Sequence, residues 1–310
     1  MIRRPPRSTQ GVSSAASDVY KRQMEHIGNA HGFIGNITPE QVRAGKNLEW
    51  VQTLSAGVEQ VLHLSGSNDL RDSDIVLTNN QIVQGPEIAD HAMAMLLAFT
   101  RDIPGFITDR QQGKWKSRGK TSSYRLIELR GKTAILIGVG GIGMQIAQRA
   151  WAFGMNVIFY DPYVPDGKEQ SVGFERCENL DELLREADVV SVHTPLTEET
   201  NGMINDQAIS CMKESAILIS TARGKVCDLE AITEALKNNR IAAAGLDVLP
   251  DEPPSPDHPL FIALNAGEKW TEGRVIVTSH VAWYSPDGAH DAREKAAKTV
   301  ISYLEDLSLI

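Results

Sequence analysis

The sequence has few cysteines, no long apolar run and no excess of positive charge, and each shortage excludes a class of protein. The three cysteines, Cys177, Cys211 and Cys227, stand apart in no metal-ligand spacing, and the eight histidines form no metal motif, so we expect neither disulfides nor a bound metal. Isolated thiols favour a reducing compartment and hence a cytoplasmic location. No stretch approaches the roughly 20 apolar residues of a membrane helix. A net charge of −9 argues against nucleic acid as a partner, because phosphate binding needs clustered basic residues.

The remaining composition is that of an ordinary globular protein, with 310 residues, 42% hydrophobic and 23% charged, which suggests about two domains. From Gly32 onward, helix and strand patterns alternate, which predicts an α/β fold with parallel sheets. A helical pattern from Glu87 to about Gln112 separates an earlier α/β block from the rest, and we expect it to bridge two domains. Beyond it, residues 181–187 and 229–236 read as helices, and 188–193 and 241–248 as strands.

A glycine-rich turn stands where a dinucleotide-binding turn should stand. A buried strand is expected at 133–138, and Gly138-Val-Gly140-Gly141-Ile142-Gly143 leads from it into a helical run at 144–151. Such glycines form the tight turn, admit the pyrophosphate and pack the helix on the strand. The next strand, 156–160, ends in Asp161, whose carboxylate is suited to bind the adenosine ribose and to repel a 2′-phosphate. The sequence therefore favours NAD over NADP as cofactor.

Three ionisable residues follow three further strand patterns: Arg223, Glu252 and His280. Because ligands bind outside the carboxyl ends of parallel strands, these side chains should converge on one crevice. A guanidinium can hold the carboxylate of a 2-oxo acid through its planar fork. An imidazole can protonate the carbonyl oxygen as hydride arrives, and a neighbouring carboxylate can fix the ring. Each of the three residues, considered alone, is more typical of an ordinary surface or loop position. The hypothesis of hydride transfer therefore depends on all three occurring together.

These motifs resemble the D-isomer-specific 2-hydroxyacid dehydrogenase family, which includes glyoxylate and hydroxypyruvate reductases and the C-terminal-binding-protein corepressors. The resemblance runs from about Met24 to the C-terminus. It implies substrate binding by Ser55, Ala56, Gly57 and Val58 and by Arg223, His280 and Trp283, and a signature at Ala89-Asp-His91 that packs between domains. It also implies a homodimer formed through the cofactor domains. Further cofactor contacts are implied for His193, Thr194, Pro195, Thr221, Ala222, Arg223, Asp247, His280 and Ala282.

Departures from the family pattern are Ser220, where Asn is common, and Glu59, where Asp is common; both look tolerable. Trp283 and Tyr284 occur both in reductases and in the corepressors, so they do not separate the two. The prediction is therefore an NAD-dependent oxidoreductase that interconverts a 2-oxo acid and a D-2-hydroxy acid, of the glyoxylate or hydroxypyruvate type. The alternative is a non-catalytic, dinucleotide-sensing binding protein that resembles the corepressors.

The N-terminal residues depart most from the family. Residues 1–23 resemble translated sequencing-adapter sequence, although their basic and Ser-rich composition also resembles a transit peptide. We expect residues 1–23 to be foreign or disordered and the chain to stop before the usual C-terminal tail. The fold expected is two Rossmann or flavodoxin-like, doubly wound parallel-sheet domains. These are an incomplete, N-terminally truncated substrate domain, 24–99 plus 284–310, and an NAD-binding domain, 100–283.

Overall fold

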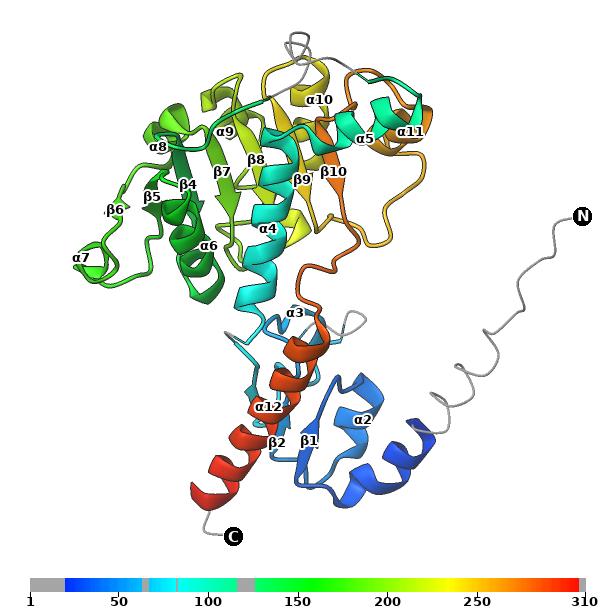
Figure 1. Cartoon of the computed structure of the whole chain (residues 1–310). Coiled ribbons are helices and arrows are strands. Elements are labelled where there is room, and N and C mark those ends of the chain that lie inside the picture. Colours follow the sequence, from blue (N-terminus) through cyan, green and yellow to red (C-terminus); the bar gives the residue numbers. More distant parts are fainter. Residues whose placement is uncertain (1–19, 63–66, 82, 116–125, 307–310) are drawn as a thin grey trace, which may run out of the picture. The chain divides into compact units, whose positions relative to one another are not determined.

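A computed structural model describes residues 20–62, 67–81, 83–115 and 126–306 (Figure 1). The chain divides into two compact units, Met1–Val83 with Ala289–Ile310, and Gln84–Gly288. Each unit is built on a parallel sheet, as the alternation of helix and strand patterns predicts. In the described residues, no helix is both long enough and apolar enough to cross a membrane.

The larger unit is built on a parallel sheet that has seven strands among the described residues, in the order β10-β9-β8-β7-β4-β5-β6. The order reverses at β4, which pairs with β5 on one side and with β7 on the other. Ligands of doubly wound sheets bind at such a switch point, outside the carboxyl ends of the strands. The strands are β4 (Thr133–Ile137), β5 (Asn156–Tyr160), β6 (Glu175–Arg176), β7 (Val189–Val192), β8 (Ile217–Ser220), β9 (Ala243–Leu246) and β10 (Val275–Val277).

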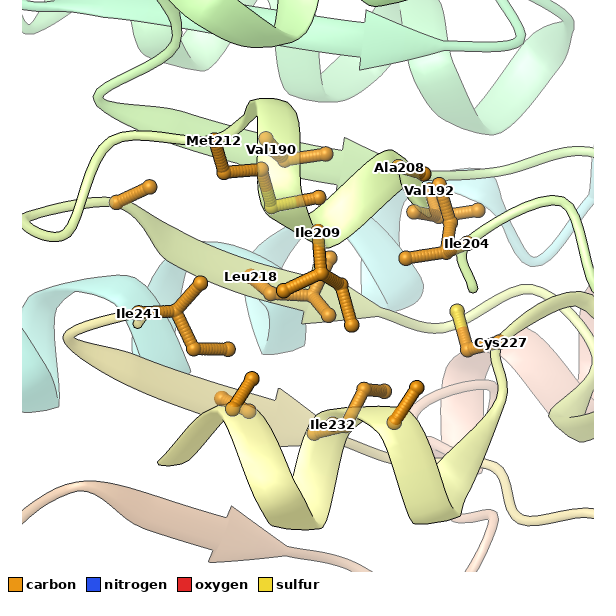
Figure 2. Packing of buried hydrophobic residues seen from close by; sticks show 14 of the residues in the cluster. Val190, Val192, Ile204, Ala208, Ile209, Met212, Leu218, Cys227, Ile232 and Ile241 are labelled. Atoms are coloured by element: carbon orange, nitrogen blue, oxygen red, sulfur yellow. The ribbon is translucent and has the colours of Figure 1, made fainter. Parts of the chain in front are cut away.

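Helices cover both faces of this sheet, because strand residues point alternately to one face and the other. Ile135 and Ile137 of β4 belong to one core, with α8, α9 and α10, while Ala134 and Leu136 belong to a second core, with α4 and α6. Figure 2 shows part of the first core. The helices are α4 (Gly85–Thr100), α5 (Ile103–Gln111), α6 (Gly141–Ala152), α7 (Lys168–Val172), α8 (Leu180–Glu186), α9 (Asp206–Cys211), α10 (Leu229–Lys237) and α11 (Pro259–Ala266), with a 3-10 turn, η4 (Gly224–Val226).

The smaller unit has a parallel sheet of three strands among its described residues, in the order β1-β2-β3. Its core contains Ile37, Val42, Leu48, Val51, Val61 and Leu70. On α12, Tyr303 stacks on Trp50, with ring centroids 4.7 Å apart. The elements are η1 (Ile27–Asn29), β1 (Gly32–Ile34), α2 (Pro39–Ala44), β2 (Trp50–Gln52), α3 (Glu59–Leu62), β3 (Val76–Thr78) and α12 (Pro286–Asp306), whose residues from Ala289 belong to this unit.

The boundaries between the two units along the chain differ from those we expected. The division falls at Gln84 and Gly288 instead of at 99/100 and 283/284. The reason is that α4 contributes Ala89, Met95 and Phe99 to the second core of the larger unit. The single helix expected from 87 to 112 is two helices, because Asp102 between α4 and α5 has a left-handed backbone, with φ of 49°.

The expectation for residues 1–23 lies mostly outside the described residues, which begin at Tyr20. Residues 20–26 are helical. Within that segment, Tyr20 donates a hydrogen bond to Glu40, and Gln23 accepts one from Gln41. Residues 20–23 therefore contact the helix α2.

Candidate active site

The glycine-rich turn has the three properties expected of it. Gly138 has φ of 89°, a conformation in which L side chains are strained. A Cβ on Gly143 would lie 2.0 Å from the carbonyl oxygen of Gly138, so only glycine lets α6 approach β4 this closely. A Cβ on Gly140, the N-cap of α6, would meet nothing within 4 Å, which leaves open space before the first turn of the helix. This is the arrangement that admits a pyrophosphate to a helix N-terminus.

Asp161 follows β5 and its carboxylate reaches back to this turn. Oδ2 accepts a hydrogen bond from the backbone N–H of Val139 at 3.0 Å, and Oδ1 accepts one from Tyr163 at 3.1 Å. The side chain is partly exposed. The carboxylate is therefore fixed beside the turn and keeps lone pairs that a ribose hydroxyl could use.

His193 and Thr194 follow β7, on the other side of the turn. The ring of His193 lies between two hydroxyls, Ser191 at 2.7 Å from Nε2 and Thr221 at 3.2 Å from Nδ1. Desolvation by burial lowers the pKa of His193 to about 3, so the ring is neutral near neutral pH. The Oγ1 of Thr194 is buried and makes no hydrogen bond within the described part of the chain. A buried hydroxyl without a partner suggests a ligand beside the turn.

Glu252 and His280 are brought together, as the sequence predicts. Nδ1 of His280 lies 2.7 Å from Oε2 of Glu252, and both side chains are partly exposed, at 39% and 36%. The other oxygen of Glu252 accepts a hydrogen bond from the backbone N–H of Leu249 at 3.0 Å, which fixes the carboxylate. Because an ionised carboxylate only accepts hydrogen bonds, Nδ1 of His280 donates to Glu252.

The segment that carries Arg223 contacts the Glu252 loop at Gly224. A Cβ on Gly224 would lie 1.9 Å from the carbonyl carbon of Leu249, so the segment after β8 packs directly on the loop that carries Glu252. The Arg223 guanidinium donates to the carbonyl of Ala222 at 2.7 Å. The three predicted catalytic residues thus lie at the carboxyl ends of β8, β9 and β10, which are adjacent strands.

The loop after β10 is held in an unusual conformation. His280 has φ of 55°, although it is not a glycine, and such a residue costs on the order of 1 kcal/mol or more. Its N–H donates to the carbonyl of Asp247 at 2.8 Å, and the Asp247 carboxylate accepts from the N–H groups of Val281 and Ala282, each at 3.0 Å. Strain of this kind is typical of active sites, where it presents a side chain to a ligand.

Several further predicted residues line these loops. Gly141 and Ile142 open α6, and Ala222 and Ala282 are buried. Trp283 is 39% exposed and donates from Nε1 to the carbonyl of His280 at 2.8 Å. Pro195 is exposed after β7.

The predicted substrate loop, Ser55 to Val58, follows β2 in the smaller unit. The hydroxyl of Ser55 donates to the carbonyl of Gly57 at 2.8 Å, and the Asn79 amide donates to the carbonyl of Ala56 at 2.7 Å. These two bonds fix the carbonyls of the loop, and neither of them uses a backbone N–H group of the loop.

Sequence reasoning missed two residues that support the Asp247 carboxylate. Thr278 donates to Oδ1 of Asp247 at 2.6 Å, and Nε2 of His91 lies 3.0 Å from the Thr278 hydroxyl. A threonine between a strand and a histidine carries no distinctive signal. His91 was noticed only as part of a signature expected between domains, whereas α4 places it inside the larger unit.

A glycine turn at a switch point of a parallel sheet is typical of a nucleotide-binding α/β protein. Residues 93–282 match the family model described as D-isomer specific 2-hydroxyacid dehydrogenase, NAD binding domain. The chain belongs to the D-isomer-specific 2-hydroxyacid dehydrogenase family.

The chain is similar to several named members of this family. It is 36% identical over 246 residues to a D-3-phosphoglycerate dehydrogenase of Archaeoglobus fulgidus, which covers 79% of this chain and 43% of the relative. It is 36% identical over 219 residues to a hydroxypyruvate reductase of Thermotoga maritima, which covers 71% of this chain and 68% of the relative. The matched part is thus less than half the length of the D-3-phosphoglycerate dehydrogenase and about two thirds of the hydroxypyruvate reductase. A D-lactate dehydrogenase of Aquifex aeolicus, solved with NAD and lactic acid, superposes with a TM-score of 0.76 at 28% identity, covering 99% of this chain and 96% of that one.

The residues present fit NAD. The space before Gly140 suits a pyrophosphate, the buried hydroxyl of Thr194 needs a partner, and Asp161 suits a ribose that has no 2′-phosphate. In the described residues, no group of three or more His, Cys, Asp or Glu side chains could hold a metal ion.

Proposed function

We propose that this protein is an NAD-dependent oxidoreductase that interconverts a 2-oxo acid and a D-2-hydroxy acid, of the glyoxylate or hydroxypyruvate reductase type. The observation that carries the proposal is the 2.7 Å contact between His280 and Glu252, together with the packing of the Glu252 loop on the segment of Arg223. The same unit carries the glycine turn, so an acid, a cation and a dinucleotide site belong to one compact body.

Bound NADH supplies the hydride for the carbonyl carbon of the substrate. His280 holds its second proton on Nε2, because Nδ1 donates to Glu252, and gives this proton to the carbonyl oxygen as that oxygen becomes an alcohol. Glu252 stabilises the positive charge on the ring and keeps the ring oriented. Arg223 binds the substrate carboxylate through its guanidinium fork. In the reverse direction, neutral His280 accepts the proton of the 2-hydroxyl group.

The cofactor is proposed to lie against Gly138, Gly140, Gly141, Ile142 and Gly143, with its ribose on Asp161. His193, Thr194, Pro195, Thr221, Ala222 and Ala282 are proposed to line the same site. Asp247 is 2% exposed, and its Oδ2 accepts one hydrogen bond in the structure, so it keeps a lone pair for the nicotinamide amide. For the Ser55–Val58 loop of the smaller unit, substrate binding through its backbone N–H groups stays a prediction of the family resemblance.

A homodimer and a cytoplasmic location complete the proposal. Three large apolar residues at neighbouring positions on one face of α5 are exposed: Ile103, Phe106 and Ile107. An apolar patch of this kind is typical of a subunit interface. All three cysteines, which lie within the described residues, are free, and this supports a reducing compartment.

The test is NADH oxidation by the full chain with glyoxylate, hydroxypyruvate and other 2-oxo acids, followed by the chirality of the product. His280→Asn should abolish reduction while NADH still binds, because Asn tolerates the left-handed backbone of His280. The control is His258→Asn, since His258 caps α11 with its side chain and Asn caps equally well.

Arg223→Lys keeps the charge but loses the fork, and we expect a loss on the order of 2 kcal/mol in transition-state binding, read from kcat/KM. Arg240→Lys, at a surface ion pair with Asp206, is its control. A wild-type protein that binds NADH and reduces no 2-oxo acid would overturn the enzymatic proposal and favour a dinucleotide-sensing binding protein.

A further inference from the structure

A chain of three side chains links α4 to the loop that carries His280. Nε2 of His91 lies 3.0 Å from the hydroxyl of Thr278, and that hydroxyl lies 2.6 Å from Oδ1 of Asp247. His91 Nε2 is also 3.8 Å from the same carboxylate oxygen. The side chain of His91 is 25% exposed and that of Asp247 is 2% exposed, so this series of hydrogen bonds runs from the edge of the core inward.

The direction of each hydrogen bond follows from the number of protons available. An ionised carboxylate only accepts, so the single proton of the Thr278 hydroxyl is donated to Asp247. The hydroxyl must then accept from His91, which requires a proton on Nε2 of His91. The structure therefore selects the Nε2–H form of His91, whether the ring is neutral or charged.

The far end of this chain is the backbone of the His280 loop. Oδ1 of Asp247 accepts from Val281 N–H, and Oδ2 accepts from Ala282 N–H. The backbone carbonyl of Asp247 accepts from His280 N–H. One residue thus binds three consecutive N–H groups, and these bonds hold His280 at its strained φ of 55°.

We propose that His91 and Thr278 are positioning residues that fix the Asp247 carboxylate and, through it, the catalytic orientation of His280. The proposal rests on the proposed function of His280 but not on the identity of the 2-oxo acid. Without the Thr278 proton, Asp247 can rotate away from the two N–H groups, and the loop is free to leave its strained conformation. The contact of His280 with Glu252 would then be lost for part of the time.

The first test replaces Thr278 by Val, which keeps the shape and removes the hydroxyl. We expect kcat to fall on the order of tenfold to a hundredfold, because a small displacement of a catalytic group has effects of this size. The KM for the 2-oxo acid should change by less than about twofold, because Arg223 is proposed to bind the substrate carboxylate and the fall is in the chemical step. Thr278→Ser should restore the activity. The control is Thr233→Val, which removes a buried hydroxyl that donates to Leu229 in α10.

The second test needs no activity. Nitrogen-15 NMR of the histidine rings, with His91 assigned by its loss in His91→Leu, should show the Nε2–H form in the wild type, and the chemical shift of its Nε2–H signal should change in Thr278→Val, which removes the acceptor of that proton. His91→Leu should lower kcat as Thr278→Val does, and His91→Gln, which can still donate, should recover part of it.

The proposal is overturned if Thr278→Val has the kcat of the wild type, or if it loses no more than Thr233→Val, or if His91 carries its proton on Nδ1 alone. A wild-type protein inactive with every 2-oxo acid would defeat the proposed function. The position of the ring proton of His91, measured by NMR, would then still test whether the hydrogen bonds from His91 through Thr278 to Asp247 exist.

Discussion

Two alanine substitutions in the glycine turn should have opposite effects on stability and cofactor binding. Gly143→Ala places a Cβ 2.0 Å from the carbonyl oxygen of Gly138 and 3.0 Å from its carbonyl carbon. Ordinary contact needs about 3.5 Å, so the turn or α6 must move by more than 1 Å, roughly. Gly140→Ala places a Cβ where nothing lies within 4 Å, at a φ of −64° that all L-residues adopt.

The size of each effect follows from what the new methyl group meets. For Gly143→Ala the neighbour is backbone, which cannot rotate away, so we expect destabilisation of about 3 kcal/mol, at the upper end of overpacking costs. For a unit of this size, that corresponds to a fall in Tm of roughly 6 to 12 °C. Gly140→Ala should leave Tm unchanged or raise the free energy of unfolding by up to about 1 kcal/mol, because alanine has less backbone freedom when unfolded.

For NADH binding, we expect Gly140→Ala to be the harmful substitution, although it leaves the stability of the protein unchanged or higher. The methyl group of Gly140→Ala enters the space we assign to the pyrophosphate, so NADH affinity should fall on the order of tenfold or more, which is about 1.4 kcal/mol. The assays are calorimetric unfolding with and without NADH and titration of NADH fluorescence. Unchanged NADH affinity in Gly140→Ala would place the pyrophosphate elsewhere, and a Gly143→Ala protein with the Tm of the wild type would refute the packing argument.

Further predictions concern single side chains. Burial lowers the pKa of His193 to about 3, so as the pH falls the unfolded chain binds a proton on this ring before the folded protein does. The free energy of unfolding should therefore fall from about pH 6.5 toward pH 3, by at most about 1.4 kcal/mol per pH unit. His193→Asn should remove this part of the pH dependence, and identical curves of stability against pH for the two proteins would contradict the reasoning. Asp161→Ala should weaken NADH binding and relax the preference against NADPH, and equal NADH and NADPH affinities in the unmutated protein would refute the assignment. Glu252→Gln should lower kcat/KM at least about tenfold whereas Asp251→Asn should not, and similar steady-state values for the two variants would leave Glu252 without a role. Burial raises the pKa of the Cys227 thiol to about 12, so an alkylating reagent at neutral pH should leave Cys227 unmodified in the native protein, as mass spectrometry would show.

The strands and helices around the glycine turn could be predicted because their signals are local. The expected strand 156–160 coincides with β5, and the expected strand 133–138 ends one residue beyond β4. The helix expected at 144–151 begins earlier, at Gly141, because glycines carry little helical signal although Gly140 caps the helix. Ser285, just before α12, accepts a hydrogen bond from Gly288 N–H, a local capping interaction of the kind that serine favours.

The convergence of the candidate site was also predictable, for a topological reason. Parallel strands carry their carboxyl ends at one edge, so residues that follow β9 and β10 meet, as Glu252 and His280 do. The break at Asp102 could not be predicted, because a left-handed Asp depends on its surroundings. The division between the units was missed for a similar reason, since the position of α4 is decided by the apolar contacts of Met95 and Phe99 with the larger sheet.

The sequence by itself determined the family and the class of cofactor, and it predicts which residues would act as acid, cation and carboxylate. These predictions depend on residue spacing along the chain, and the spacing of the glycine turn and of the three strand ends can be read from the sequence. Only the tertiary structure decided how His280 is held, because His91 and Thr278 lie 187 residues apart and leave no periodic signal. A hydrogen-bond chain of this kind exists only when packing brings its members within 3 Å, and the folded backbone alone fixes that distance.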